Sequence, residues 1–458
     1  MKRFDFKSRG TSLSTEVIAG ITTFFAMVYI IVVNPMILGE TGMNAGGVFV
    51  ATILAAVVGT LIMGIVADVP YAQAPGMGLN AFFTFTVCFG MGFQWQEALA
   101  MVFVCGIINV IITVTKVRKS ILKSIPLSLQ HAIGGAIGLF IAYLGLINSG
   151  LVKLGAVPEL ASFNDLGALL AVIGLIITVI LVVKKVKGAI FIGIIASTLI
   201  AIPLGLVKLD NFQFFDISSI GNVKETAFAF FGDTGFASMF SEPAKIIPAI
   251  VAIFAFSLSD TFDTIGTFIG TGRVSGIFDE DDEKALEEGN GFKSKMDKAL
   301  FADSTATSIG ALLGTSNTTT YVESASGIAA GGKTGMTSIV TAILFLLCLP
   351  FSQVFGLVPS QAVAPALIVV GIMMASSLAE IKWADFSEAV PAFMTLLITA
   401  FAYNISYGIA AGFIFYVIVK LCNNKAKEVH PIIYGASIFF IINFLVIALQ
   451  AHGLFKFS

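Results

Sequence analysis

Two aspartates stand in an apolar stretch of the sequence, and they are the first candidates for chemistry. "IFAFSLSDTFDTIGTFIG" runs from Ile253 to Gly270 and carries Asp260 and Asp263. Their spacing of three residues places both on one face of a helix. A carboxylate at bilayer depth costs at least ~2.5 kcal/mol. Two close carboxylates in a low dielectric do not easily ionise together, so one is expected to take up and release a proton. The structural alternative is hydrogen bonding between helices by neutral aspartates.

Two interrupted segments elsewhere in the chain carry further polar groups. In "YAQAPGMGLNAFFTFTV" (71–87), Pro75, Gly76 and Gly78 disfavour a helix before Leu79. In "GTSNTTTYVESASGIAAGGKTG" (314–335), the β-branched "NTTTY" favours a short extended piece, followed by a helix of small residues. We expect the two extended pieces to pair inside the protein, because burial in a membrane requires their backbone groups to be satisfied.

Such a pair would aim two helix N-termini at one point, where free N–H groups can donate to carbonyl or ring-nitrogen acceptors. Glu323 falls at the start of the second helix, as a cap or a dipole partner. Tyr321 offers an aromatic face and a hydroxyl, and the Asn80 amide offers both a donor and an acceptor. The plainer interpretation is that glycine and threonine only permit close helix packing.

The composition indicates the environment of these residues. Of 458 residues, 57% are hydrophobic and 12% are charged, whereas soluble domains carry about 25% charged residues. The chain is therefore predicted to be a polytopic membrane protein. The net charge of −2 and the lack of a long basic tract argue against nucleic-acid binding. No HExxH, GxSxG or paired catalytic His and Ser is present, so no enzyme is predicted. The cysteines lack metal-ligand spacing and are interpreted as buried thiols, with no cofactor expected: Cys88, Cys105, Cys348 and Cys422.

Fourteen apolar runs set the expected topology. They cover 17–38, 46–67, 74–90, 94–115, 128–147, 166–183, 189–207, 243–270, 299–314, 317–331, 335–356, 361–379, 391–404 and 407–421. Basic residues favour the cytoplasmic side of a membrane. The N-terminus and alternate loops are basic, which predicts a cytoplasmic N-terminus: Lys2, Arg3, Lys7, Arg9, Lys116, Arg118, Lys119, Lys123, Lys184, Lys185, Lys187, Arg273, Lys293, Lys295, Lys298, Lys425 and Lys427. The acidic stretch 279–298 is interpreted as a solvated connector, and a further run, 432–449, either spans or lies at the interface.

A weak internal repeat agrees with this count. "IAGITTFFAM" (18–27) and "IPAIVAIFAF" (247–256) lie half a chain apart and share four identical positions. In this register Asn34 corresponds to Asp263. The first run starts inside and the eighth outside, so two halves of seven runs have opposite orientation. That is the inverted-repeat arrangement of secondary transporters, which bind their substrate between discontinuous helices near the midplane.

The motifs "QAPGMGLNAFF", "SLSDTFDTIGTFIG" and "NTTTYVESASGIAAGGKTG" resemble the third, eighth and tenth segments of the nucleobase–cation symporter-2 superfamily. More narrowly, the whole chain resembles its AzgA-like branch of hypoxanthine, guanine and adenine permeases. The resemblance implies an all-α fold of seven plus seven inverted repeats, with short β pieces in segments 3 and 10. It also implies a core domain (1–127 and 243–358) and a gate domain (128–242 and 359–458).

The same resemblance implies a purine between the third and tenth segments, contacted from the eighth. Glu323 matches the glutamate that hydrogen-bonds the base, and Asp260 matches the eighth-segment acid. Thr264 stands where uracil permeases carry a histidine, so a histidine-based proton relay is not expected. The substrate-binding residues are predicted to be Asn80, Asp260, Glu323, Tyr321, Gly78 and Thr264, and the proton-coupling residues Asp260, Asp263 and Glu323.

The implied activity is import of purine bases with a proton, by an elevator-type cycle, across the plasma membrane. The gate domains are expected to form a homodimer. Two alternatives stay open: sodium coupling, and an anion transporter of the related sulfate and bicarbonate folds. Three carboxylates around the site argue against an anion, since they would repel it. Asp303 is interpreted as a helix cap, and His131 and His430 as interfacial residues without a site role.

Overall fold

The fold is described from a computed structural model. It covers residues 4–115, 124–154, 158–160, 165–207, 212–272, 275–278, 282 and 294–451. The basic residues between 116 and 123, Arg273, Lys293 and most of the acidic stretch 279–298 lie outside the described residues. The expectations for those loops therefore stay predictions.

The elements are mostly helices, joined by short connections. The first half contains α1 (Leu13–Met27), α2 (Ile30–Gly39), α3 (Ala45–Ile62), β1 (Gln73–Pro75), α4 (Met77–Ala81), α5 (Trp95–Val114), α7 (Leu127–Asn148), β2 (Val152–Leu154), β3 (Pro158–Leu160), α8 (Leu166–Val183) and α9 (Ala189–Ala201). The second half contains α10 (Phe236–Met239), α11 (Pro243–Thr267), α14 (Lys295–Leu313), β4 (Thr318–Thr320), α15 (Ser324–Ala329), α16 (Gly335–Leu346), α17 (Ser352–Gly356), α18 (Ser360–Ala375), α19 (Phe386–Phe401), α20 (Ile405–Cys422) and α21 (Pro431–Ala451). Short π or 3₁₀ turns extend four helices: Met63–Ala67, Phe82–Gly90, Phe268–Gly272 and Ser376–Glu380.

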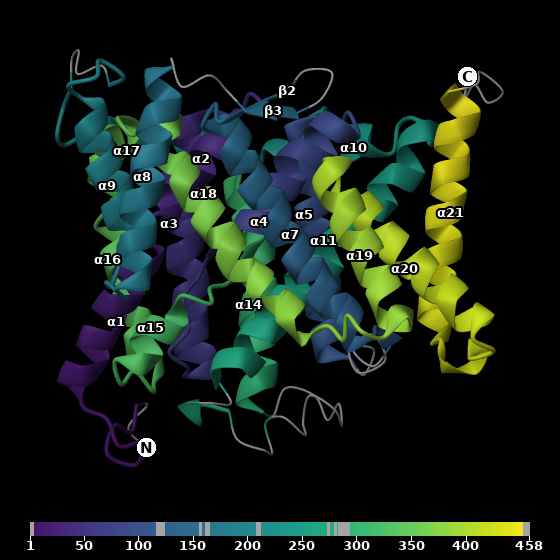
Figure 1. The fold of residues 1–458 in the computed structure, drawn as a ribbon. Coiled ribbons are helices and arrows are strands. Elements are labelled where there is room, and N and C mark those ends of the chain that lie inside the picture. Colours follow the sequence, from purple (N-terminus) through teal and green to yellow (C-terminus); the bar gives the residue numbers. More distant parts are fainter. Residues whose placement is uncertain are drawn as a thin grey trace.

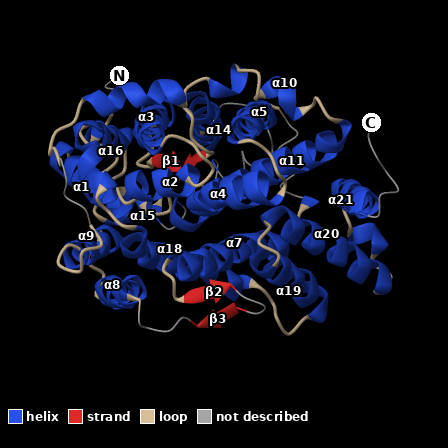
Figure 2. Ribbon diagram, turned by 90° about the horizontal axis from the view of Figure 1, so that it is seen from above, coloured by secondary structure: helices blue, strands red, loops and turns tan. Residues whose placement is uncertain are grey.

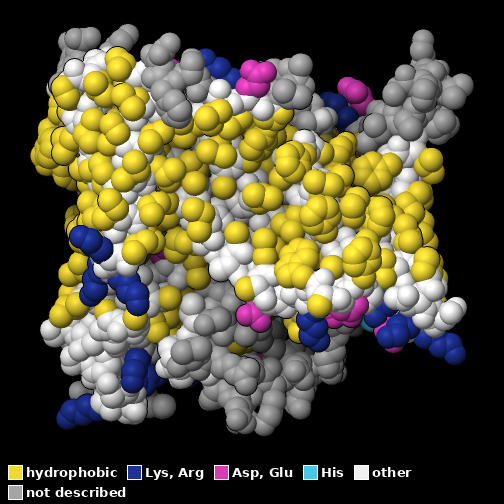
Figure 3. Space-filling view, in the orientation of Figure 1, with side chains coloured by type: hydrophobic (Ala, Val, Ile, Leu, Met, Phe, Trp, Pro, Cys, Tyr) yellow, Lys and Arg dark blue, Asp and Glu magenta, His cyan; other side chains and the backbone are white. Residues whose placement is uncertain are grey.

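The protein has a polytopic membrane fold. Each of the fourteen predicted apolar runs contains a helix. Within the described residues, nine helical stretches are long and apolar enough to cross a membrane. Most long helices stand side by side (Figure 1), and apolar side chains cover the middle of the visible surface while charged ones gather toward its two ends (Figure 3). α21 packs on α20 and stands upright beside it, which is not the orientation of an interfacial helix.

The two interrupted segments pair as the sequence predicts. β1 and β4 run antiparallel, with Gln73 opposite Thr320 and Pro75 opposite Thr318. Both strands are fully buried, and α2, α3 and α14 enclose β1 (Figure 2). Further backbone bonds close the ends of the ladder: Gly76 donates to the Asn317 carbonyl at 2.9 Å and Tyr321 to the Ala72 carbonyl at 3.0 Å. The pair therefore satisfies its own backbone within the protein.

Three sequence expectations need correction. The helix of the third segment does not wait until Leu79: α4 begins at Met77 and includes Gly78. Asp303 is not a cap: α14 begins at Lys295, where Ser294 and Asp297 form a capping box, so Asp303 lies inside the helix. Cys422 is exposed at the end of α20, whereas Cys88, Cys105 and Cys348 are buried as expected.

Candidate functional site

Glu323 lies where β4 leads into α15. It occupies the N-cap position of that helix and is half-buried. The Tyr29 hydroxyl donates a hydrogen bond of 2.5 Å to its Oε1. Tyr29 is buried at the break between α1 and α2. Its position follows from that break, since the amides of Ile31 and Val32 bond to carbonyls only three residues earlier and Pro35 cannot donate to the Ile31 carbonyl.

Asp263 opens onto accessible space beside Glu323. Although it lies within α11, its side chain is exposed, and it is close enough to Glu323 for their charges to interact. Gly266, one turn further along α11, is also exposed, and a side chain there would meet no neighbour within 4 Å. Val322, next to Glu323, is 47% exposed. Two neighbouring carboxylates therefore keep accessible surface at the start of a short helix.

Asp260 turns away from that space. Its side chain is fully buried, and its Oδ2 accepts hydrogen bonds from Asn109 of α5 at 3.0 Å and from Thr307 of α14 at 3.2 Å. Residues three apart on a helix point about 60° apart. Here that angle separates one aspartate packed among helices from one facing open space.

Asp303 lies on the same buried side, against both strands. Its Oδ1 accepts hydrogen bonds from Thr320 at 2.7 Å and from Gln73 at 3.2 Å. Thr264, one turn after Asp260 on α11, shares a hydrogen bond of 2.8 Å with Thr319. The predicted site residue Thr264 is thus a buried contact to β4.

The other predicted site residues line the strands rather than the open space. The Tyr321 hydroxyl donates a hydrogen bond of 2.6 Å to the Pro75 carbonyl, and this bond ties the two interrupted segments together. Asn80 is buried, accepts a hydrogen bond from Ser316, and leaves its Nδ2 without a partner. Gly78 faces α7, where a Cβ would overlap Ile137. The structure therefore brings Tyr321, Glu323 and Asp263 together and places Gly78 at a helix contact.

Asn34, the repeat counterpart of Asp263, is a buried connector. Its Nδ2 donates to Thr52 at 2.7 Å and to Thr315 at 2.8 Å. It therefore ties α2 and α3 to the segment just before β4, and it does not face open space. No group of three or more metal-ligating side chains occurs in the described part of the chain.

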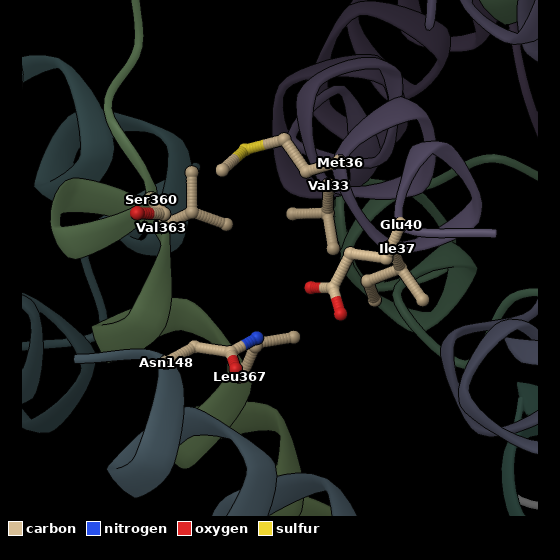
Figure 4. Close-up of a pocket in the computed structure, with 8 residues that line it drawn as sticks. All are labelled: Val33, Met36, Ile37, Glu40, Asn148, Ser360, Val363 and Leu367. Carbon is tan, nitrogen blue, oxygen red and sulfur yellow. The ribbon is translucent and has the colours of Figure 1, made fainter. Parts of the chain in front are cut away.

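A separate cavity of about 350 Å³ lies at the far end of α2 (Figure 4). Its walls come from α2, α7 and α18, and they consist of Val33, Met36, Ile37, Glu40, Asn148, Ser360, Val363 and Leu367. The Glu40 carboxylate and the Asn148 amide point into the space from different sides (Figure 4). Burial raises the pKa of the Glu40 carboxyl.

The sequence itself matches a known family over most of its length. The sequence model of the permease family covers residues 14–447 of this chain. The chain belongs to the nucleobase–cation symporter-2 permeases. Members of this family are transporters, and the chain is a transmembrane permease rather than an enzyme.

Two curated family members show the extent of the similarity. The guanine/hypoxanthine permease PbuG of Bacillus subtilis is 40% identical over 96% of this chain and 98% of its own length. The adenine permease AdeP of Escherichia coli is 38% identical over 98% of this chain and 96% of its own length. Both alignments cover nearly the full length of both proteins.

Among solved structures, the permease is similar to the transmembrane domain of the cyanobacterial bicarbonate transporter BicA. The TM-score is 0.63 with 14% sequence identity, over 88% of this chain and 98% of that one. The likeness shows a shared fold and carries no information about the substrate.

Proposed function

We propose that this permease imports purine nucleobases, namely hypoxanthine, guanine or adenine. The observation that carries the proposal is the meeting of Asp263 and Glu323 at an open space beside the paired strands. Purine bases carry N–H donors on their rings, and carboxylates are the strongest acceptors for them. Relatives named as guanine/hypoxanthine and adenine permeases support the same substrate class.

We assign the direct contacts to the residues nearest the open space. Glu323, held by Tyr29, accepts one N–H of the base, and Asp263 accepts another. Tyr321 supports these contacts from behind, because its hydroxyl donates to the Pro75 carbonyl and ties the two strands together. Asp260, Thr264, Asn80 and Gly78 support the strands and helices behind this contact surface.

We propose an elevator cycle with proton symport, in which a core domain moves against a gate domain. In this proposal the chain is divided into core and gate at 127/128, 242/243 and 358/359, in line with the seven-plus-seven repeat. Contacts support the division: α18 packs on α7, α8 and α9, and α14 packs on α3 and α5. In Figure 2, α7, α8, α18 and α19 form a row along one side of the molecule.

In this proposal the protein lies in the plasma membrane with a cytoplasmic N-terminus and forms a homodimer through its gate domains. The cavity at the far end of α2 then opens on the outer side, between core and gate. An anion substrate is not favoured: two carboxylates border the open space, and the likeness to a bicarbonate transporter concerns the fold alone.

Neutralising either carboxylate tests the substrate contacts. Glu323→Gln and Asp263→Asn keep the side-chain shapes but weaken acceptance of a purine N–H, so hypoxanthine uptake by cells should be abolished while membrane expression is unchanged. Uptake of labelled hypoxanthine, with a panel of competing bases and with sulfate, measures this. Asp165→Asn is the control, because Asp165 caps α8 away from the site. Normal uptake by both site variants, or competition by sulfate, would refute the proposal.

A further inference from the structure

A second carboxylate pair lies behind the paired strands. Asp260 and Thr264 are one turn apart on α11, and Asp303 and Thr307 are one turn apart on α14. The two pairs face each other, because Thr307 donates to Asp260. β4 joins them: Thr264 bonds Thr319, Thr320 bonds Asp303, and Thr307 also donates to the Thr318 carbonyl at 3.0 Å. Asp260 and Asp303 are close enough for their charges to interact.

In the part of the chain that the structure describes, no cation balances this pair. Asp260 is fully buried and Asp303 is 3% exposed. Within the described residues, neither forms an ion pair with a Lys, Arg or His, and the other titratable groups that face them are Cys105 of α5 and Asp263 of α11. Two adjacent negative charges buried without a counter-charge cost several kcal/mol per ion. Burial therefore favours a pair that carries at most one negative charge.

Buried acceptors without donors lie at the same place. Asp260 Oδ1 and Asn317 Oδ1 are both buried acceptors with no donor at hydrogen-bond distance. The fully buried Asn317 side chain is the hydrogen-bonding group that faces Asp260. Buried acceptors without donors are rare in native structures. A proton bound to Asp260 would remove one charge from the pair and supply a donor to the group that faces it.

We propose that Asp260 and Asp303 share the proton that is coupled to transport, at a site separate from the purine contacts. The inference rests on the proposed function and assigns Asp303 a role beside Asp260. One proton enters from the outer side and neutralises the pair, and it leaves to the cytoplasmic side when the pair becomes charged again. Asp263 and Glu323 accept the N–H groups of the base and do not carry the coupled proton.

The strand β4 provides the mechanical link between the two places. Thr320 bonds Asp303 directly, and the other two threonines bond Thr264 and Thr307, each one turn along the helix from a member of the pair. The chain reaches Glu323 three residues after Thr320. A change in the charge of the pair therefore alters the hydrogen bonds that hold the strand in front of the base. Coupling of this kind is reciprocal, so a bound base must raise the proton affinity of the pair as much as a bound proton raises base affinity.

Asp303→Asn in purified protein reconstituted into proteoliposomes tests the assignment. With one proton per base, a pH gradient of one unit supports up to about tenfold accumulation of hypoxanthine. In the variant we expect exchange of labelled hypoxanthine against internal hypoxanthine to persist, while accumulation driven by the pH gradient is lost. Asp297→Asn, on the same helix but in its capping box, should accumulate hypoxanthine like the wild type.

A second variant leaves both carboxylates in place. Thr320→Val removes the donor to Asp303 and so disfavours the charged pair. The midpoint of the pH dependence of uptake should move to higher pH by about one to two units, the value of one hydrogen bond to a charged group. A merely structural role of Thr320 would lower the rate without moving the midpoint.

The outcomes separate the two proposals. Asp303→Asn that accumulates hypoxanthine with the wild-type pH dependence overturns the proton site and leaves the purine assignment standing. If Asp303→Asn does not fold, the Asp260→Asn and Thr320→Val variants test the proton site instead. An unshifted midpoint of the pH dependence of uptake in Thr320→Val overturns the proton site. Wild-type accumulation driven by sodium without a pH gradient overturns it as well. Wild-type protein that neither binds nor exchanges purines refutes the proposed function itself.

Discussion

The hydrogen bond from Tyr29 to Glu323 gives a quantitative test of the substrate site. Tyr29→Phe keeps the buried ring and removes only the hydroxyl that donates to Oε1 at 2.5 Å. A hydrogen bond to a charged group contributes about 1.5–3 kcal/mol. If this bond fixes the carboxylate where it meets the base, its loss weakens base binding by about 10- to 150-fold, since each 1.36 kcal/mol is a factor of ten.

Equilibrium binding of labelled hypoxanthine to purified protein measures this directly, and uptake kinetics should show the change in KM. Tyr321→Phe is the matched control. Its hydroxyl donates to the Pro75 carbonyl, a neutral acceptor, so its removal costs about 0.5–1.5 kcal/mol of stability and leaves base affinity close to the wild-type value. Tyr29→Phe with unchanged affinity, or with an effect no larger than that of Tyr321→Phe, would refute the positioning role of Tyr29.

Two further predictions concern the packing around the site. Gly78→Leu should lower the thermal stability of the purified protein, because the new side chain overlaps Ile137 of α7; overpacking of this kind costs about 1–3 kcal/mol, and an unchanged melting temperature would contradict the close contact. Val363→Trp fills the cavity between α2 and α18, so it should slow hypoxanthine entry from the outer side in right-side-out vesicles without weakening binding to solubilised protein. An unaltered entry rate would show that the cavity is not on the path.

The paired strands were predictable because their signals are local. Pro75 and Gly76 disfavour a helix at the strand, although α4 begins directly after them at Met77, and "NTTTY" favours an extended chain. Backbone satisfaction in a membrane then leaves pairing as the available solution. The position of Glu323 at a helix start follows from the same reasoning. The register of β1 against β4 was not predictable. It depends on contacts between residues far apart in sequence, such as Tyr321 and Pro75.

Tyr29 could not be found from the sequence. It stands in a run of apolar residues, and its partner lies 294 residues away, so no spacing pattern links the two. The break that positions it follows from Pro35 only once the local backbone is seen.

Asp303 did leave a signal. Ser294 and Asp297 have the spacing of a capping box and begin α14 before its apolar run. With the helix start at Lys295, Asp303 lies more than one turn inside α14, where a charged side chain in a membrane protein indicates a functional site by default.

The separation of Asp260 from Asp263 changes how the coupling of base and proton can work. If one carboxylate held both, the two would compete for its oxygens, and proton binding would weaken base binding. A symporter needs the opposite sign, because each ligand must raise the affinity for the other. An acceptor pair open to the base and a buried pair linked to it by Thr318–Thr320 permit that sign: neutralising the buried pair relieves repulsion on Asp263, whose charge is then free to accept the purine N–H. The base in turn withdraws Asp263 and Glu323 from water and favours a proton on the pair behind them.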